Sequence, residues 1–218
     1  MKKLFVLAFL STTALSIGQF SAADTTQVFV ASHERGTVNF RPSIGYNSQS
    51  IEVDRQPSYL SASLKDNNIV FGLEVEYVLP TNRNKLAIMI EPNYSSFKSE
   101  VDYANPGTND GTVAIAFKQL SVPVGVRYKM FLSTDSKLFL SGVFVPSFLS
   151  DNKYAYSSNG GASYINSTSY GFGLGIGFEY KPAVLELRYN TPKGLNPNFD
   201  VDYRQVCLIL RYRVFQIH

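Results

Sequence analysis

One segment of the chain, residues 170–180, alternates between large and minimal side chains along nearly its whole length. The large side chains are Tyr170, Phe172, Leu174, Ile176, Phe178 and Tyr180. Between them lie Gly171, Gly173, Gly175, Gly177 and Glu179. Successive side chains of a β-strand point to opposite faces of the sheet. The alternation therefore predicts a strand with one apolar face and one nearly bare face.

The bare face and the tyrosine ends narrow this interpretation further. Interior glycines weaken an ordinary strand, but they fit where the space on one side is almost used up, as inside a narrow barrel. An apolar ladder that ends in Tyr170 and Tyr180 suits a bilayer, because aromatic rings with a polar tip concentrate at its two interfaces. The segment therefore predicts one wall of a small transmembrane β-barrel.

The start of the chain has the pattern of a secretory signal peptide over residues 1–23. Lys2 and Lys3 precede an apolar core, and Ser21-Ala22-Ala23 supplies small residues at a cleavage site. The apolar run is shorter than the roughly 20 residues that a membrane-spanning helix needs. We expect cleavage before Asp24, a lead-in without assigned structure over 24–36, and the barrel over 37–215.

Charge and cysteine content exclude several classes of function. Loss of Lys2 and Lys3 lowers the formal charge from +3 to +1, which is too balanced for a nucleic-acid-binding protein. Cys207 is the single cysteine, so internal disulfides and cysteine-rich metal sites are excluded. We expect no cofactor and no metal.

The rest of the chain contains further segments with the same alternation, which gives eight predicted strands. They cover residues 37–54, 69–79, 86–102, 113–130, 138–150, 170–180, 183–190 and 206–214. Short turns at 80–85, 133–137 and 181–182 alternate with long connections at 55–68, 103–112, 151–167 and 191–202. An even strand number with short turns on one rim and long loops on the other is typical of bacterial outer-membrane barrels. We therefore predict an all-β, eight-stranded, antiparallel up-and-down transmembrane barrel located in the bacterial outer membrane.

The strand at 138–150 has no assigned facing, because both of its faces carry large apolar side chains. Leu138, Leu140 and Phe144 compete with Phe139, Val143 and Val145 for the outer face.

The alternation leaves two orientations open, since a soluble periplasmic barrel that carries an apolar ligand turns its apolar face inward. The polar face is rich in glycine and small residues, and tyrosines recur at the ends of the apolar ladders; both features favour lipid outside. The residues expected to face lipid are Phe71, Leu73, Val75, Val122, Val124, Phe172, Leu174, Ile176, Phe178, Leu185, Leu187, Leu208 and Leu210.

Charged residues at mid-strand positions of the polar face indicate a filled interior. They are Arg41, Glu74, Glu76, Glu91, Arg127, Lys129, Glu179, Glu186, Arg188, Arg211 and Arg213. Five acids and six bases nearly balance, and charges crowded together away from water must pair. Eight strands leave an interior that side chains can fill. We therefore predict an internal ion-pair network and no diffusive pore.

Three segments carry a family resemblance over about residues 37–215. They are LEVEYVLPTNRNK (73–85), QLSVPVGVRYKMF (119–131) and LELRYN (185–190), together with the glycine-aromatic strand. With these the chain resembles the porin-like outer-membrane β-barrel family of Bacteroidota, with OmpA- and OmpX-like strand number. The resemblance implies architecture and identifies no activity. The terminal aromatic of such barrels is displaced here, because Phe215 is followed by Gln216, Ile217 and His218.

The function predicted from these features is a non-enzymatic envelope or surface-interaction role. A lipid-modifying enzyme of the outer membrane is an alternative, but His33 and His218 lie beside no strand-borne serine. Tyr154, Tyr156 and Tyr164, in the longest loop, are candidate contacts for an unidentified extracellular ligand, because Tyr among Ser, Gly and Asn makes adaptable binding surfaces. The other expected partners are outer-membrane lipid and the barrel-assembly machinery, with the protein a monomer.

Overall fold

The computed structural model describes residues 36–55, 60–103, 111–156, 161–163, 167–193 and 200–217. Its elements are β1 (Val38–Arg55), β2 (Leu60–Val78), the 3-10 turn η2 (Asn82–Asn84), β3 (Leu86–Ile90), β4 (Asn93–Tyr103), β5 (Gly111–Ser121), β6 (Val124–Phe131), β7 (Ser136–Tyr156), β8 (Gly161–Ser163), β9 (Thr168–Tyr180), β10 (Ala183–Lys193), β11 (Asp200–Tyr212) and β12 (Phe215–Ile217). Within the described ranges no helix is long and apolar enough to cross a membrane.

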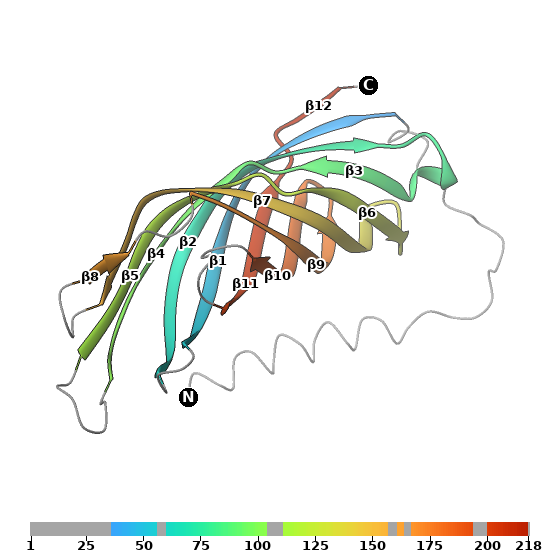
Figure 1. Ribbon diagram of the computed structural model, residues 1–218. Coiled ribbons are helices and arrows are strands. Elements are labelled where there is room, and N and C mark those ends of the chain that lie inside the picture. Colours follow the sequence, from blue (N-terminus) through green and yellow to red (C-terminus); the bar gives the residue numbers. More distant parts are fainter. Residues whose placement is uncertain are drawn as a thin grey trace, which may run out of the picture.

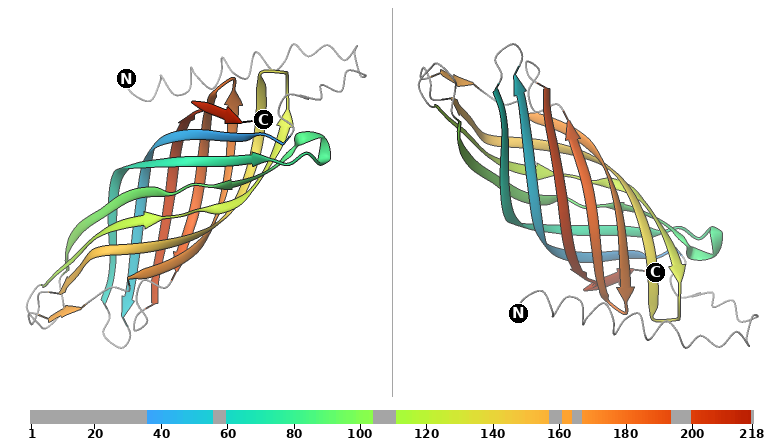
Figure 2. Two further views of the ribbon diagram at one scale, coloured as in Figure 1. Left: turned by 90° about the horizontal axis from the view of Figure 1, so that it is seen from above. Right: turned by 90° about the horizontal axis from the view of Figure 1, so that it is seen from below.

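The strands pair antiparallel into one closed ring, seen along two directions in Figure 2. The wall consists of β1, β2, β3 with β4, β5 with β6, β7, β9, β10 and β11, and β1 pairs with both β2 and β11 to close it. The eight-stranded antiparallel barrel predicted from the sequence is confirmed.

Two predicted strands are interrupted at prolines. The wall strand over 86–102 breaks between β3 and β4 at Pro92, and the one over 113–130 breaks between β5 and β6 at Pro123. Proline lacks a backbone N–H and so interrupts a hydrogen-bond ladder. The ring continues through both breaks, because Leu73 N–H donates to the Pro92 carbonyl (3.0 Å) and Glu91 N–H donates to the Pro123 carbonyl (2.9 Å).

The strands on the long-connection side are longer than predicted. Residues 60–68 belong to β2, β7 extends to Tyr156, β10 reaches Lys193, and β11 begins at Asp200. The predicted connections at 55–68, 151–167 and 191–202 are therefore partly strand. The outward residues Ser63, Lys65 and Asn67 of β2 are polar, so this segment lacks the apolar ladder on which the prediction relied. Figure 1 shows the long hairpins and the short turns at opposite ends of the barrel.

The outer surface carries a band of exposed apolar side chains. Phe172, Leu174 and Ile176 are 66%, 73% and 56% exposed, while Glu74 and Arg211 are buried. This arrangement contradicts the alternative of a soluble carrier with an apolar interior. Eleven of the thirteen side chains expected to face lipid are exposed.

The exceptions are Val75 and Val122, which are half-buried. Val75 lies between Phe40 and Ile90 on its two neighbouring strands, and Val122 directly precedes the break at Pro123.

Tyrosines mark both edges of the apolar band. Tyr46, Tyr94, Tyr170 and Tyr189 are exposed on the side of the long hairpins, and Tyr77, Tyr128, Tyr180 and Tyr212 on the side of the short turns. Ten residue steps separate Tyr170 from Tyr180 in β9, which is about 33 Å of strand. At a tilt of roughly 40° this corresponds to an apolar height of about 25 Å, the value typical of outer-membrane barrels.

The facing of β7, which the sequence left open, follows from its pairing. Phe139, Val143 and Val145 are buried in the lumen, and Leu138, Leu140 and Phe144 are exposed. At the end of the chain β12 pairs with the first residues of β1, and the rings of Phe40 and Phe215 lie 5.9 Å apart.

Glycine at position 177 is required by its neighbours. A Cβ there would lie 2.5 Å from the Leu185 carbonyl oxygen and still closer to the Phe139 ring, whereas at Gly142, which faces outward, the nearest atom would be 4.0 Å away. We expect Gly177→Ala to lower the free energy of unfolding by about 1–3 kcal/mol, as overpacking does. Gly142→Ala is the matched control and should change it little. Urea unfolding in phospholipid vesicles measures both, and equal stabilities would contradict the packing described here.

Candidate functional site

Charged side chains fill the half of the lumen nearer the short turns. Eleven of them are buried: Arg41, Glu74, Glu76, Glu91, Arg127, Lys129, Lys137, Glu179, Glu186, Arg188 and Arg211. We call this set the charge cluster. Its members come from every strand of the wall, with Glu91 at the junction of β3 and β4. Their positions follow from strand alternation, which turns each of them to the side opposite the lipid-facing ladder.

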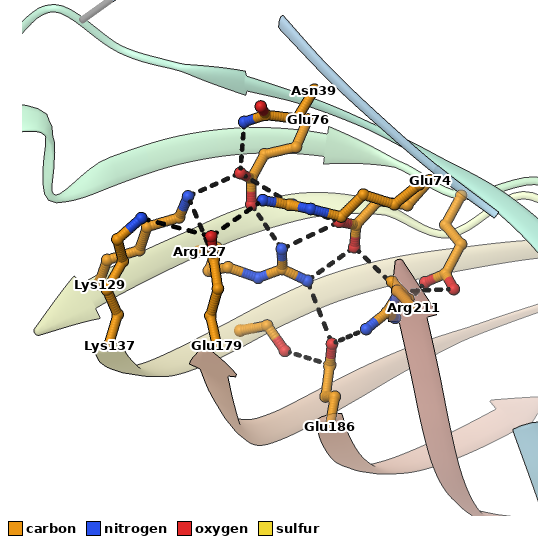
Figure 3. Close-up of polar contacts among 12 residues, drawn as sticks. Asn39, Glu74, Glu76, Arg127, Lys129, Lys137, Glu179, Glu186 and Arg211 are labelled. Atoms are coloured by element: carbon orange, nitrogen blue, oxygen red, sulfur yellow. Dashed lines mark hydrogen bonds and ion pairs between the residues drawn. The ribbon is translucent and has the colours of Figure 1, made fainter. Parts of the chain in front are cut away.

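Glu74 of β2 lies between the guanidinium groups of Arg127 and Arg211 in the charge cluster (Figure 3). Its carboxylate is 2.8 Å from Arg41 Nη1, 2.7 Å from Arg127 Nη2 and 3.2 Å from Arg211 Nε. These guanidinium groups come from β1, β6 and β11, so one carboxylate connects four wall strands.

Glu186 of β10 is a second carboxylate that contacts three basic side chains at once. Its carboxylate lies 2.8 Å from Arg188 Nε, 2.8 Å from Arg211 Nη1 and 3.1 Å from Arg127 Nη2. The hydroxyl of Ser141 also donates a hydrogen bond of 2.7 Å to it. A Cβ on Gly175 would collide with both Glu186 and Ser141, so the bare face of β9 makes room for this carboxylate.

Glu76 and Glu179 occupy the part of the charge cluster closest to the short turns. Glu76 pairs with Lys129 (2.6 Å), Arg127 (2.5 Å) and Arg41 (2.9 Å). Glu179 pairs with Lys137 (3.3 Å), Arg41 (3.4 Å) and Lys129 (3.7 Å). Each carboxylate is therefore surrounded by three basic groups.

Glu91 completes the charge cluster on the side of the long hairpins. It lies 2.7 Å from Arg211 Nη2 and 2.9 Å from Arg188 Nη1. Arg127 also stacks over the Phe139 ring, 4.3 Å from its centre. Charges out of water are stabilised only by close, well-oriented partners, and every acid of the charge cluster has at least two.

The structure brings together ten of the eleven charged residues expected in the lumen. The eleventh, Arg213, lies half-buried between β11 and β12. The sequence reasoning missed Lys137 because it sits at the edge of a predicted turn. Its pairing opposite Glu179 in the β7–β9 ladder is the signal that identifies it.

A layer of neutral polar side chains lies beyond the charge cluster. Gln119 Nε2 donates to the hydroxyls of Ser121 (2.8 Å) and Ser147 (2.9 Å), and the Cys207 thiol donates to Asn47 Oδ1 (3.0 Å). A cavity of about 20 Å³ in this layer is lined by Asn47, Cys207 and Arg188. Such a volume holds about one water molecule and no larger solute.

An aromatic layer closes the lumen at its outer end. Phe97 and Phe117 stack with ring centres 5.1 Å apart, and Tyr203 meets both edge-on at 6.5 and 6.2 Å. The Tyr203 hydroxyl hydrogen-bonds to Gln49 and Gln119. Sequence reasoning missed this layer, although Tyr203 shares its strand face with Gln205 and Cys207.

The carboxylates of the lumen are each paired with basic side chains. The described residues hold no group of three His, Cys, Asp or Glu that could bind a metal. His33 and His218 lie outside the described residues, as do Tyr164 and the side chains of Tyr154 and Tyr156. The arrangement suits a plug that fills the barrel.

Comparison with known proteins identifies the family of this architecture. Residues 22–200 match the family model described as outer membrane protein beta-barrel domain. No curated protein matches the sequence.

Among solved structures, OprG of Pseudomonas aeruginosa is similar at 18% identity, with a TM-score of 0.51, 86% of this chain and 99% of that chain covered. Neisserial surface protein A is similar at 17% identity, with a TM-score of 0.45 and 82% and 99% covered. The attachment invasion locus protein Ail of Yersinia pestis is similar at 18% identity, with a TM-score of 0.42 and 84% and 99% covered. The similarity to OprG supports the barrel fold of this chain and carries no statement about its function.

The three guanidinium partners of Glu74 predict a large effect of neutralising it. Glu74→Gln removes the buried negative charge that three guanidinium groups share. We therefore expect a loss of about 3–5 kcal/mol in the free energy of unfolding. The control is Glu52→Gln, which removes a half-exposed partner 3.9 Å from Arg204 and should cost less than about 1 kcal/mol. Urea titration in vesicles compares the two, and similar losses would contradict the importance of the charge cluster.

The filled lumen also predicts the electrical behaviour of the protein. In planar bilayers the purified protein should show no stable large conductance, because side chains occupy the interior. A reproducible wide pore in repeated single-channel recordings would contradict this expectation.

Proposed function

Because the chain belongs to the outer membrane protein beta-barrel domain family, we propose that it is a sealed, non-enzymatic protein of the bacterial outer membrane that acts through its projecting hairpins. The observation that carries this proposal is the charge cluster, to which every wall strand contributes. A lumen filled in this way offers no path for a solute and leaves the surfaces beyond the membrane as the places where the protein can interact.

The projecting hairpins supply such a surface. β1 and β2 remain paired as far as Arg55 and Leu60, nine residues beyond Tyr46, which is about 30 Å of strand. β4 and β5 remain paired as far as Tyr103 and Gly111. Binding residues are common on loops held by a rigid scaffold. Tyr154, Tyr156 and Tyr164 are our candidates for contact with an extracellular ligand.

Four narrower features belong to the same proposal. Residues 1–23 act as a cleaved signal peptide, the barrel-assembly machinery inserts the protein, and the protein is a monomer. The fourth feature is a family relationship to the porin-like barrels of Bacteroidota, which the segments at 73–85, 119–131 and 185–190 support.

A structural role in the envelope is a second candidate, favoured by the density of ion pairs in the lumen. The two roles differ in whether they need the hairpins. We design a shortened variant in which an Asn-Gly turn replaces residues 53–62 and another replaces residues 102–112. The new turns join Glu52 to Ser63 and Val101 to Val113, which are paired residues, and Asn-Gly is a favourable two-residue hairpin turn.

Complementation of a deletion strain distinguishes the two roles. If the β1–β2 and β4–β5 hairpins carry the function, the shortened variant should fail to restore binding to host or neighbouring-cell surfaces, although it restores resistance to detergent and bile salts. Folding of the variant is checked by its heat-dependent migration on gels. Full restoration of surface binding by the shortened variant would contradict a role for these hairpins.

The proposed orientation predicts which rim is exposed to the medium. An epitope tag inserted after residue 106, in the β4–β5 hairpin, should be labelled by antibody on intact cells. The matched tag after Asp135, in the short β6–β7 turn, should be labelled only after the outer membrane is permeabilised. Labelling of the second tag on intact cells would reverse the orientation.

A further inference from the structure

Three lysines lie on the outer face of one wall, just beyond the apolar band. They are Lys65 of β2, Lys98 of β4 and Lys118 of β5, and all three side chains are exposed. Each has the same strand facing as the lipid-facing ladder below it: Lys65 is four residues from Ile69, Lys98 four from Tyr94 and Lys118 two from Leu120. We call these residues the lysine patch.

The strand pairing places the three lysines near one another. Lys98 N–H donates to Asp66 Oδ2 (3.1 Å), and the Ser99 hydroxyl donates to the Lys65 carbonyl (2.9 Å). Lys118 is paired with Ser96, two residues from Lys98. Neighbouring strands are about 4.8 Å apart, so long ammonium side chains from β2, β4 and β5 can reach one ligand.

The height of the lysine patch corresponds to the headgroup layer of the membrane. Lys118 lies two residues, and Lys65 and Lys98 lie four residues, beyond the last outward apolar side chain of their strands. At the tilt of such barrels this is about 5–10 Å above the apolar band. The headgroup layer extends roughly 5–8 Å beyond the hydrocarbon on each side.

The charges around the lysine patch leave it basic. Two carboxylates lie beside its three ammonium groups: Glu100, exposed two residues beyond Lys98, and Asp66, whose Oδ2 accepts the Lys98 N–H. At the same level the outward residues are Thr168 on β9 and Thr191 and Lys193 on β10. On β11 the outward Arg204 lies 3.9 Å from Glu52. Three outward lysines therefore lie together on the β2–β4–β5 wall, whereas the described residues of β10 and β11 include one outward basic side chain each at this level.

We propose that the lysine patch binds the phosphate-bearing headgroup of an outer-leaflet lipid. Its position above exposed Phe71 and Tyr94 lets the acyl chains of the same lipid lie against the apolar band. The proposal is independent of the function of the hairpins, because the lysine patch lies on the barrel wall. A lysine near an anionic lipid surface strengthens association about fivefold.

The test uses the full-length protein in detergent micelles and native mass spectrometry. The probes are diphosphorylated lipid A and the same lipid with both phosphates removed. We expect the wild type to retain the phosphorylated lipid at least tenfold more strongly. The variant K65Q/K98Q/K118Q should lose this preference. The control R83Q/K85Q/K181Q removes the same charge from the short-turn rim and should keep it.

Two results would overturn the proposal. One is equal binding of the two lipids by the wild type. Displacement of both lipids by inorganic phosphate to the same extent would count as the same result. The other is an unchanged preference in K65Q/K98Q/K118Q with folding verified by gel migration. If the triple variant does not fold, the single variant K118Q takes its place. Its preference for the phosphorylated lipid should fall about fivefold, and an unchanged preference would contradict a role for the lysine patch.

Discussion

The pairing of charges inside the lumen is the constraint on which the rest of this barrel depends. Five glutamates and six basic side chains are buried there, and such groups are costly without close partners. Many of their contacts connect strands that are not neighbours, as between Arg41 of β1 and Glu179 of β9. A shift of one residue in register would turn a whole row of these charges toward lipid. The charge cluster therefore stabilises one register and penalises the others.

The bare face of β9 is the complement of this crowding. Ser141 and Glu186 fill the space that a side chain at position 175 would need, the Phe139 ring fills that at 177, and Asn190 fills that at 173. The glycines weaken β9 as an isolated strand, but they let its neighbours extend across the lumen. The sequence feature that first predicted a barrel wall is thus explained by the side chains of the adjoining strands.

Strand positions within the membrane could be predicted because lipid imposes a simple rule on the outer face. The rule stops where the apolar ladder ends, at Ile69, Phe148 and Val206, so it does not predict the outer parts of β2, β7 and β11. It also could not orient β7, where both faces are apolar; the pairing of Lys137 with Glu179 decides that facing. The aromatic layer around Tyr203 could not be predicted, because Tyr203 precedes the strand expected over 206–214 and therefore had no predicted facing.

At the tyrosine edge the outer face of the wall changes from apolar to polar, and the inner face changes from polar to apolar. β4 shows both changes most clearly. Tyr94 faces lipid while Ser95 is buried; farther out, Phe97 is buried and Lys98 is exposed. Below the edge the surroundings are lipid, so apolar groups point outward. Above it the surroundings are lipid headgroups and water, so apolar groups such as Phe97 and Phe117 turn inward and stack. The projecting part therefore has an apolar core of its own, separate from the charge cluster. Substitutions at the hairpin tips can then alter what the protein contacts without disturbing the ion pairs that hold the membrane part together.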